Sequence, residues 1–370
     1  MATKRSVKNQ KYETYWKLTL EYSDIFGEPF NNVLQIMVDF IDTYKLYENE
    51  LTKELYSMLQ EKVYHVYPKV DNGSTRKSLN QFVKLGFIEP KLKGYHKLTK
   101  QFIKETNKEK KRDLFSRIVY ENSKFNAAIT GFDNVRQINF LIKTLAYSGP
   151  LNEEDLCALI SLKDISNIKK GFLTREELET QKRFVSTTGF NDRKYNQKSY
   201  LYCIAKRLTG VFCRNRILSL DSDNLPDTEE LKSRDPYLHS LYKKALKDES
   251  KKIFGKIVCD FEQIEYTSYV ASHIKPFHES SPEEQYNVNN GFLFSRNIDI
   301  LFDKFDLTFD INGNPIWGRR VSKEFQERYK NHKIDKRLLN PARLEFLKTH
   351  NSKFYEKNKS WLLLFFCFQY

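Results

Sequence analysis

Hydrophobic and polar residues follow two different periods along this chain, and together they predict a mainly helical α+β protein. The spacing of apolar residues and the helix-start signals predict helices at 48–63, 75–85, 135–146, 152–162, 194–208 and 236–250. Short apolar or β-branched runs bounded by turn residues are typical of strands, and they lie at 216–220, 266–271, 291–294 and 307–310. The helices dominate the first part of the chain, and most of the strands come toward its end.

Changes in composition divide the chain into three parts. Residues 221–236 are acidic and contain proline, which is typical of a linker. We therefore expect a first domain at 1–110, a second helical domain at 111–225, and a third domain at 236–370. A chain of 370 residues is long enough for two or three such domains.

The helices at 48–63 and 75–85 follow one another like the two helices of a DNA-reading unit. Two short strands at 87–90 and 97–99 would then form a wing with basic residues at its tip. This order resembles a winged helix-turn-helix, which implies that the second helix enters the DNA major groove. The side chains of that helix expected to face DNA are Arg76, Lys77, Asn80, Gln81 and Lys84. A unit that contacts another protein, or simple helix packing, is the alternative.

The helices at 135–146, 152–162 and 194–208, followed by the strand at 216–220, repeat this order loosely. They predict a second domain that is also winged-helix-like. Polar and basic side chains gather at the start of its last helix, where helix-end amides can also meet phosphates or base edges. These DNA-contact candidates are Arg193, Lys194, Asn196, Gln197 and Lys198.

A strand, a loop, a second strand and a helix are predicted between residues 266 and 303. The first strand leads to His273, and a polar loop then returns the chain to the strand at 291–294. Ser295 is a candidate N-cap for the helix, from which Asp299 would project. Such an arrangement can hold the parts of a metal-assisted nuclease, which are a base for water and a carboxylate for a cation beside the attacked phosphate.

Three short blocks in this region resemble the HNH, or ββα-metal, endonuclease family. They read SHIKP at 272–276, NGFLFS at 290–295 and DILFD at 299–303, similar to the branch with SHIKP, NGLLLS and D-x-LFD. The resemblance implies that His273 is the general base, that Asn290 braces the loop and orients His273, and that Asp299 binds a divalent metal. It extends over residues 253–320, because the family often appends a hairpin like the one predicted at 307–317.

Ser272 stands where many members of this family have an aspartate that binds the metal. A serine hydroxyl is a poor ligand for a hard cation, so we expect a loosely held Mg²⁺ on Asp299, waters and substrate phosphate. Asp303 is an alternative ligand, and Asn290 before a glycine could instead serve turn geometry. Two basic side chains flank the motif and are candidate phosphate contacts: Lys275 and Arg296.

The formal net charge of +14, from 62 Lys and Arg against 48 Asp and Glu, favours a polyanionic partner such as nucleic acid. The five cysteines form no Cys-x-x-Cys pair, so neither a disulfide framework nor structural zinc is expected. The start has no signal-peptide pattern, and the apolar run 361–370 is too short to span a bilayer. We therefore expect a cytoplasmic protein of prokaryotic type with no membrane partner.

The length of chain ahead of the motif bears on specificity. A degradative nuclease needs only phosphate contacts, whereas two upstream domains rich in Asn, Gln, Arg and Lys imply base readout. The sequence thus predicts a type II restriction-like endonuclease that cuts double-stranded DNA as a homodimer and has a cognate DNA methyltransferase as partner. The alternatives are a modification-dependent or homing HNH endonuclease, and a non-catalytic winged-helix DNA-binding regulator.

Overall fold

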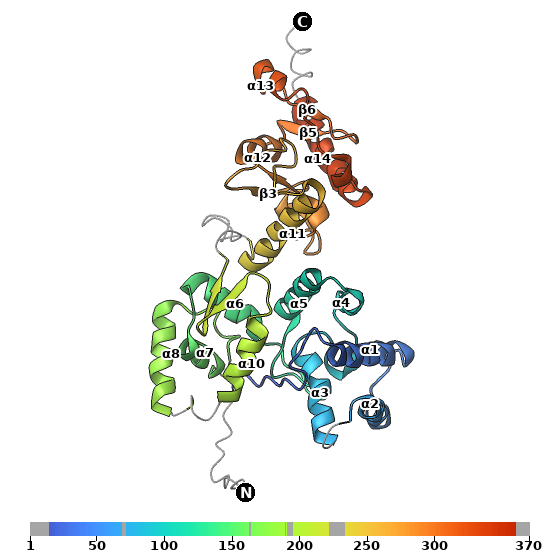
Figure 1. Cartoon of the computed structure of the whole chain (residues 1–370), viewed down its shortest axis with the longest axis vertical. Helices are drawn as coiled ribbons and strands as arrows, with labels where there is room; N and C mark the ends of the chain where they lie inside the picture. Colours follow the sequence, from blue (N-terminus) through green and yellow to red (C-terminus); the bar gives the residue numbers. More distant parts are fainter. Residues whose placement is uncertain are drawn as a thin grey trace, which may run out of the picture. The chain divides into compact units, whose positions relative to one another are not determined.

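The computed structural model describes residues 15–68, 72–162, 164–188, 190, 195–221 and 234–359, which form two compact units. The first unit is Met1–Ser222 and the second is Asp223–Tyr370, coloured from blue to yellow-green and from yellow to red in Figure 1. The boundary falls within residues 221–236. The further division of the first unit at residue 110 stays a prediction. The apolar run at 361–370 lies outside the described residues.

The first unit is built from helices and one short hairpin. Its helices are α1 (Glu28–Thr43), α2 (Lys53–Val66), α3 (Asn72–Lys84), α4 (Thr99–Lys104), α5 (Lys108–Asn122), α6 (Gln137–Ser148), α7 (Glu153–Ile160), α8 (Arg175–Thr188) and α10 (Tyr195–Ala205). Its strands are β1 (Val211–Arg214) and β2 (Ile217–Leu220), which pair antiparallel. The predicted helices at 48–63, 135–146, 152–162 and 194–208 are confirmed as α2, α6, α7 and α10, with displaced ends.

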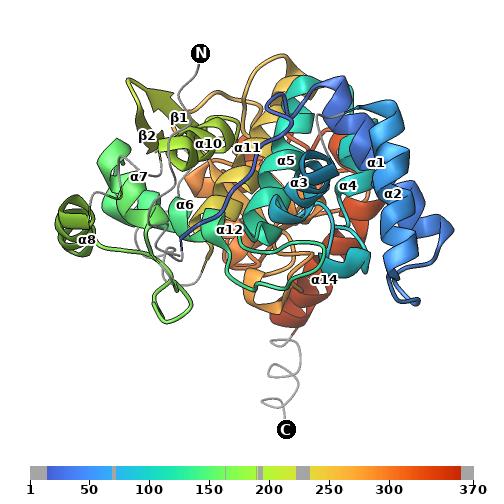
Figure 2. The ribbon, with the colours of Figure 1, turned by 90° about the horizontal axis from the view of Figure 1, so that it is seen from below.

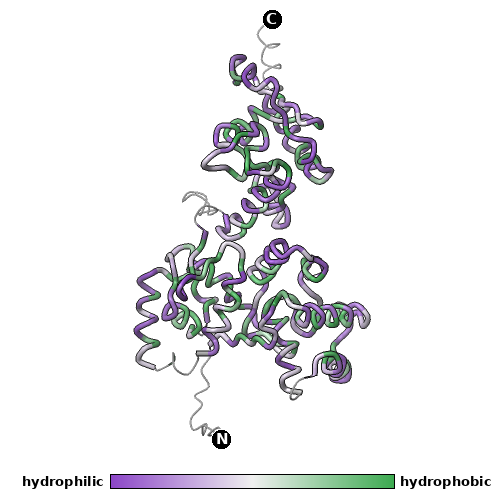
Figure 3. Tube along the Cα trace, in the orientation of Figure 1, coloured by the Kyte–Doolittle hydropathy of each residue, from purple (hydrophilic) through white to green (hydrophobic). Residues whose placement is uncertain are grey.

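Periodic apolar residues explain how these helices pack. In α1, Phe30, Val33, Leu34, Met37 and Ile41 recur at helical spacing and are all fully buried. α8 lies beside α7 in both ribbon views (Figures 1 and 2). It is hydrophilic along most of its length (Figure 3), and its buried residues are Leu178 and Val185. The apolar contact between α8 and the rest of the first unit is therefore small.

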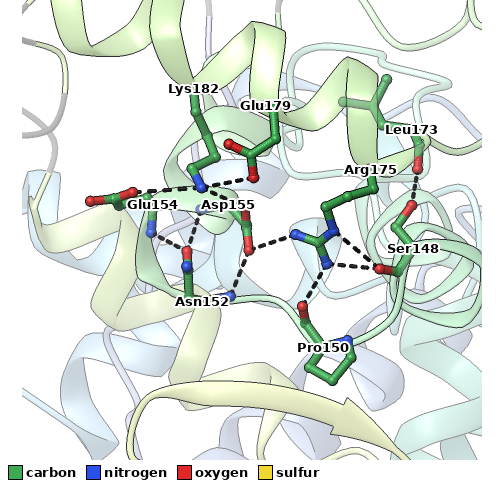
Figure 4. A network of polar contacts seen from close by, with 9 residues as sticks. All are labelled: Ser148, Pro150, Asn152, Glu154, Asp155, Leu173, Arg175, Glu179 and Lys182. Atoms are coloured by element: carbon green, nitrogen blue, oxygen red, sulfur yellow. Dashed lines mark hydrogen bonds and ion pairs between the residues drawn. The ribbon is translucent and has the colours of Figure 1, made fainter.

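Polar contacts make up for this small apolar contact between α7 and α8 (Figure 4). Asp155 is 1% exposed, caps the start of α7 together with Asn152, and accepts a hydrogen bond from Arg175 at 3.2 Å. The Arg175 guanidinium also donates to the carbonyls of Ser148 and Pro150, both at 2.7 Å. This charge-assisted network, with Asp155 buried and Arg175 partly exposed, fixes α8 against the start of α7.

The expected wing after α3 is formed only in part. Ile88 and Tyr95 make a single antiparallel bridge, and the short 3-10 helix η1 (Pro90–Leu92) occupies the expected tip. The prediction of a strand at 97–99 is wrong, because Thr99 already begins α4.

The second unit holds the motif region. Its helices are α11 (Pro236–Phe254), α12 (Arg296–Asp303), α13 (Lys323–Arg328) and α14 (Pro341–Lys359), with short 3-10 helices η4 (Phe277–Glu279), η5 (Val288–Asn290) and η6 (Lys336–Leu338). Its hairpins are β3 (Val270–His273) with β4 (Gly291–Phe294), and β5 (Leu307–Phe309) with β6 (Pro315–Trp317). The strand predicted at 266–271 begins later, at Val270. The mainly helical α+β class is confirmed.

One apolar core joins these elements. Phe292, Phe294, Phe302 and Phe309 come from β4, α12 and β5 and are fully buried in one aromatic cluster. Arg343 of α14 is fully buried over the face of Phe292, at 5.3 Å. Its guanidinium donates to the Glu249 carboxylate of α11 (2.6 Å) and to the carbonyls of Val288 (2.9 Å) and Leu338 (2.7 Å). The charged group therefore ties α11 and α14 to the loop before β4.

Candidate active site

The β3–β4 hairpin places the motif residues at neighbouring positions. His273, the last residue of β3, pairs with Gly291, the first residue of β4. The chain that leaves after His273 returns at the same end of the hairpin, where the Ile274 amide donates to the Asn290 carbonyl at 3.2 Å. The hydroxyl of Ser295 accepts from the Ile298 amide at 3.4 Å, so the predicted N-cap of α12 is confirmed. α12 packs against both strands.

The side chain of Asn290 is fully buried inside the loop between β3 and β4. Its Oδ1 accepts from the Lys275 amide at 2.8 Å. Its Nδ2 donates to the Lys275 carbonyl (3.3 Å), the Ser280 hydroxyl (3.1 Å) and the Glu284 carbonyl (3.2 Å). Gly291 that follows has an extended backbone with φ −158°, so no left-handed glycine turn occurs here. Asn290 thus holds both ends of the loop from within.

The imidazole of His273 has a defined tautomer. Its Nε2 lies 2.8 Å from the Gln285 carbonyl oxygen, which can only accept, so Nε2 carries the proton and Nδ1 keeps a lone pair. Nδ1 is buried and has no hydrogen-bond partner among the described residues. Burial, more than the nearby Arg234 charge, lowers the pKa of His273 to about 4, and the Gln285 contact opposes this. The ring is therefore neutral near neutral pH.

The helix α11 and the residue that precedes its N-cap add three side chains to this site. The ring of Tyr242 stacks on His273 with centroids 4.8 Å apart and planes 27° apart. His239 lies one turn earlier, is 3% exposed, and has its pKa lowered to about 3, chiefly by burial. The guanidinium of Arg234 lies 5.3 Å from the centre of the Phe277 ring, which stands at 80° to the His273 ring.

A cavity of about 480 Å³ brings together residues of β3, of the loop that follows it and of α12, with Arg234 from the segment before α11. Ser272 and His273 line it from β3, and Asp299 and Asp303 line it from α12. The two carboxylates are four residues apart and therefore share one face of the helix. Arg234 also lines the cavity. The site thus combines the His273 lone pair, the two carboxylates of α12 and one guanidinium, and the cavity is also lined by His278 and by Glu279, which pairs with Lys353.

The donor set fits a divalent cation that keeps part of its water shell. The described residues contain no group of three or more His, Cys, Asp and Glu side chains suited to hold a metal. The α12 carboxylates line an open cavity, which suits a divalent cation bound through one or two carboxylates plus waters and substrate phosphate. The Ser272 hydroxyl is buried and has no hydrogen-bond partner in the described structure. It lines the same cavity as the two carboxylates.

Several of the expected DNA contacts are used inside the protein instead. The prediction for Gln81 is wrong, because its side chain is fully buried and accepts from the amides of Glu21 (2.7 Å) and Tyr22 (2.8 Å). That for Lys84 is also wrong. Its Nζ donates to the carbonyls of Lys17 and Phe125, and burial lowers its pKa to about 8.

The other candidates differ in exposure and in their contacts. Four are exposed: Arg76, Lys77, Asn196 and Arg296. Engaged within the protein are Asn80, which accepts from the Ile129 amide (2.8 Å), Lys198, which pairs with Glu153 (3.0 Å), and Lys275, which pairs with Glu284 (2.6 Å). Gln197 is half-buried, and Arg193 and Lys194 lie outside the described residues.

Sequence patterns gave no sign of Arg234, His239 or Tyr242. Arg234 stands in the acidic segment that reads as a linker. His239 and Tyr242 belong to a helix whose polar and apolar spacing is equally typical of a packing helix. Only the tertiary contact between α11 and the β3–β4 hairpin brings them to the site.

Comparison with known families agrees with the site. The family model described as HNH endonuclease matches residues 257–310, which include β3, β4, α12 and β5. The second unit therefore contains an HNH endonuclease domain, and this domain supports nuclease activity, DNA as substrate and the use of a divalent metal. The match covers a minority of the chain and leaves α11 out. No curated protein matches the chain.

No helix in the described ranges combines the length and the apolar character needed to cross a bilayer.

Proposed function

We propose that this protein is a sequence-specific endonuclease of restriction type that cuts double-stranded DNA at the site around His273. One observation carries the proposal: a single cavity is lined by an imidazole with a free lone pair and by the two carboxylates of α12. These are the base and the cation ligands that hydrolysis of a phosphodiester needs.

In the proposed reaction, Nδ1 of His273 takes a proton from the attacking water. The water oxygen bonds to phosphorus, the bond from phosphorus to the 3′ oxygen breaks, and the 3′ oxygen takes a proton from solvent water, leaving a 5′-phosphate and a 3′-hydroxyl. Nδ1 is buried in the free protein. The proposal is therefore that the attacking water reaches Nδ1 only when DNA is bound, as is common for catalytic contacts. The low pKa of His273 keeps the ring unprotonated and also makes it a weak base.

Asn290 and the carboxylates have supporting roles in this proposal. Asn290 holds the loop whose Gln285 carbonyl fixes the tautomer of His273. Asp299, with Asp303 beside it, would hold a divalent cation, most simply Mg²⁺, which neutralises charge on the attacked phosphate when bound. Arg234 lines the same cavity and can donate two parallel hydrogen bonds to a phosphate of the substrate.

A second, basic cavity supports DNA as the partner of this unit. It has a volume of about 700 Å³ and lies between the β5–β6 hairpin and α13. Three exposed lysines line it, Lys323, Lys330 and Lys333, of which Lys330 is paired with Glu327. Exposed cations grouped in this way attract a phosphate backbone.

Sequence specificity is assigned to the first unit. The exposed Arg76 and Lys77 at the start of α3 are the candidates for groove contacts, and a winged-helix-like role rests on α2, α3 and the bridge between Ile88 and Tyr95. A single HNH site cuts one strand, so cleavage of both strands calls for a homodimer on a near-palindromic site. A methyltransferase acting on the same site, in a prokaryotic cytoplasm, would complete such a system.

The test is incubation of supercoiled plasmid with the protein and Mg²⁺. The wild-type protein is expected to convert the plasmid to discrete linear fragments whose ends share one short sequence. The variants His273→Ala and Asp299→Ala should leave it supercoiled, while His65→Ala, which changes an exposed histidine in α2, should cut normally. Equal absence of cutting by wild type and His273→Ala would refute the nuclease, and a smear of fragments would refute sequence specificity.

A further inference from the structure

The contact between α11 and His273 is the strongest feature of the site that the motif does not contain. Tyr242 is 2% exposed and lies 15 residues before the segment matched by the HNH family, as 257 − 242. Its ring covers one face of the His273 imidazole, with centroids 4.8 Å apart. Offset stacking of this kind fixes the plane of a ring and excludes water from that face.

The hydroxyl of Tyr242 contacts the other strand of the hairpin. It donates to the Asn290 carbonyl at 3.0 Å, and the same carbonyl accepts from the Ile274 amide at 3.2 Å. Burial raises the pKa of this hydroxyl, so it stays protonated and able to donate. Tyr242 therefore touches His273 by its face and Asn290 by its hydroxyl, which are two of the three motif positions.

Gly291 explains how the ring can come so close. A Cβ atom added to Gly291 would lie 2.7 Å from Cζ of Tyr242 and nearer still to its hydroxyl oxygen. The backbone at Gly291 is extended and any residue could adopt it. The glycine is thus required by the space that Tyr242 occupies and not by a turn.

The His273 ring is held on three sides. The Gln285 carbonyl fixes Nε2 at 2.8 Å, the Phe277 ring stands nearly perpendicular to the imidazole with centroids 5.5 Å apart, and Tyr242 covers a face. The hydrogen bond fixes where one nitrogen lies but leaves rotation about that bond open. The stacked ring of Tyr242 removes this remaining freedom, so that Nδ1 keeps one direction.

We propose that Tyr242 is a positioning residue for His273, acting through ring stacking, with its hydroxyl in a secondary role. The inference rests on the proposed function of His273 as the base. It places α11, which the family match leaves out, within the working site of the nuclease.

The experiment compares Tyr242→Leu, which removes the stacked ring, with Tyr242→Phe, which keeps the ring and removes only the hydroxyl. Tyr242→Leu should lower kcat for plasmid nicking by roughly tenfold to a hundredfold with little change in KM, since small errors of alignment have effects of that size. Tyr242→Phe should keep most of the wild-type kcat. Leu246→Ala, a buried change one turn further along α11, serves as a control for lost packing and should keep kcat at permissive temperature.

A second measurement does not depend on activity. In protein with ¹³C-labelled histidine rings, the ring protons of His273, assigned with His273→Gln, should resonate upfield because of the stacked tyrosine. They should stay upfield in Tyr242→Phe and move downfield in Tyr242→Leu. Upfield signals that persist in Tyr242→Leu, or a wild-type kcat in that variant, would overturn the proposal. If the His273 ring protons show the expected upfield shifts but the protein has no nicking activity, the result would count against the proposed function alone.

Discussion

Adding one methyl group at Gly291 is the most direct test of the packing around His273. In Gly291→Ala the new Cβ would lie 2.7 Å from Cζ of Tyr242, whereas ordinary contacts begin at 3.4 Å, so the ring must retreat by at least 0.7 Å, as 3.4 − 2.7. Such overpacking costs about 1–3 kcal/mol of stability. A displacement approaching 1 Å also lowers kcat by roughly tenfold to a hundredfold.

The assay is steady-state nicking of supercoiled plasmid together with hydrogen exchange of the β3–β4 amides, which reports the stability of the second unit separately. Gly131→Ala is the matched control, because a Cβ there meets nothing within 4 Å. The double variant Gly291→Ala, Tyr242→Leu should be little worse than Tyr242→Leu alone, since the clash is gone. Wild-type kcat and exchange rates in Gly291→Ala would refute this reasoning.

Four further predictions concern other charged groups. Arg343→Met should destabilise the second unit by about 3–5 kcal/mol, because it leaves the Glu249 carboxylate and two carbonyls without their donor. The measurement is amide exchange in α14, which should become faster. Unchanged exchange would contradict a stabilising role for the Arg343–Glu249 pair. Burial raises the pKa of Asp260 from its usual value of 3.8 to about 7, so folding binds a proton and wild-type stability falls as pH rises through this window. In urea unfolding, the free energy of unfolding of Asp260→Asn should therefore rise relative to that of wild type by about 1.4 kcal/mol per pH unit between pH 4 and 7. If the difference between the two free energies did not depend on pH, Asp260 would not be protonated in the folded protein. Changing both Lys323 and Lys333 to Gln should reduce the slope of log K against log salt by about 2 in DNA-binding titrations, whereas an unchanged slope would remove that cavity from the DNA contacts. Arg234→Gln should raise KM about tenfold or more while Arg234→Lys retains part of the affinity, and equal KM values would exclude a phosphate contact.

The core of the candidate site could be predicted because its signals are local. The bounds of β4 and the Ser295 cap of α12 follow from alternation, turn residues and capping chemistry within a few positions. The start of β3 was predicted four residues too early, since the β-branched run at 266–271 says nothing about which residues find a partner strand.

Long-range contacts account for most of the errors. Helical periodicity places Gln81 and Lys84 on the polar face of α3, yet their partners Tyr22 and Lys17 lie 59 and 67 residues earlier in the chain. A buried polar side chain satisfied by distant backbone has the same local pattern as an exposed one. Tyr242 was missed for the same reason, because its partner His273 lies on another element.

The position of α11 also decides how this protein can be dissected. A fragment that begins at residue 257, where the family match starts, would keep every motif residue and lose Tyr242 from the face of His273. It would also lose Glu249, the only carboxylate that Arg343 contacts among the described residues. The smallest autonomous nuclease piece should therefore start before Arg234, which makes the family boundary a poor guide for cutting and fusing this domain.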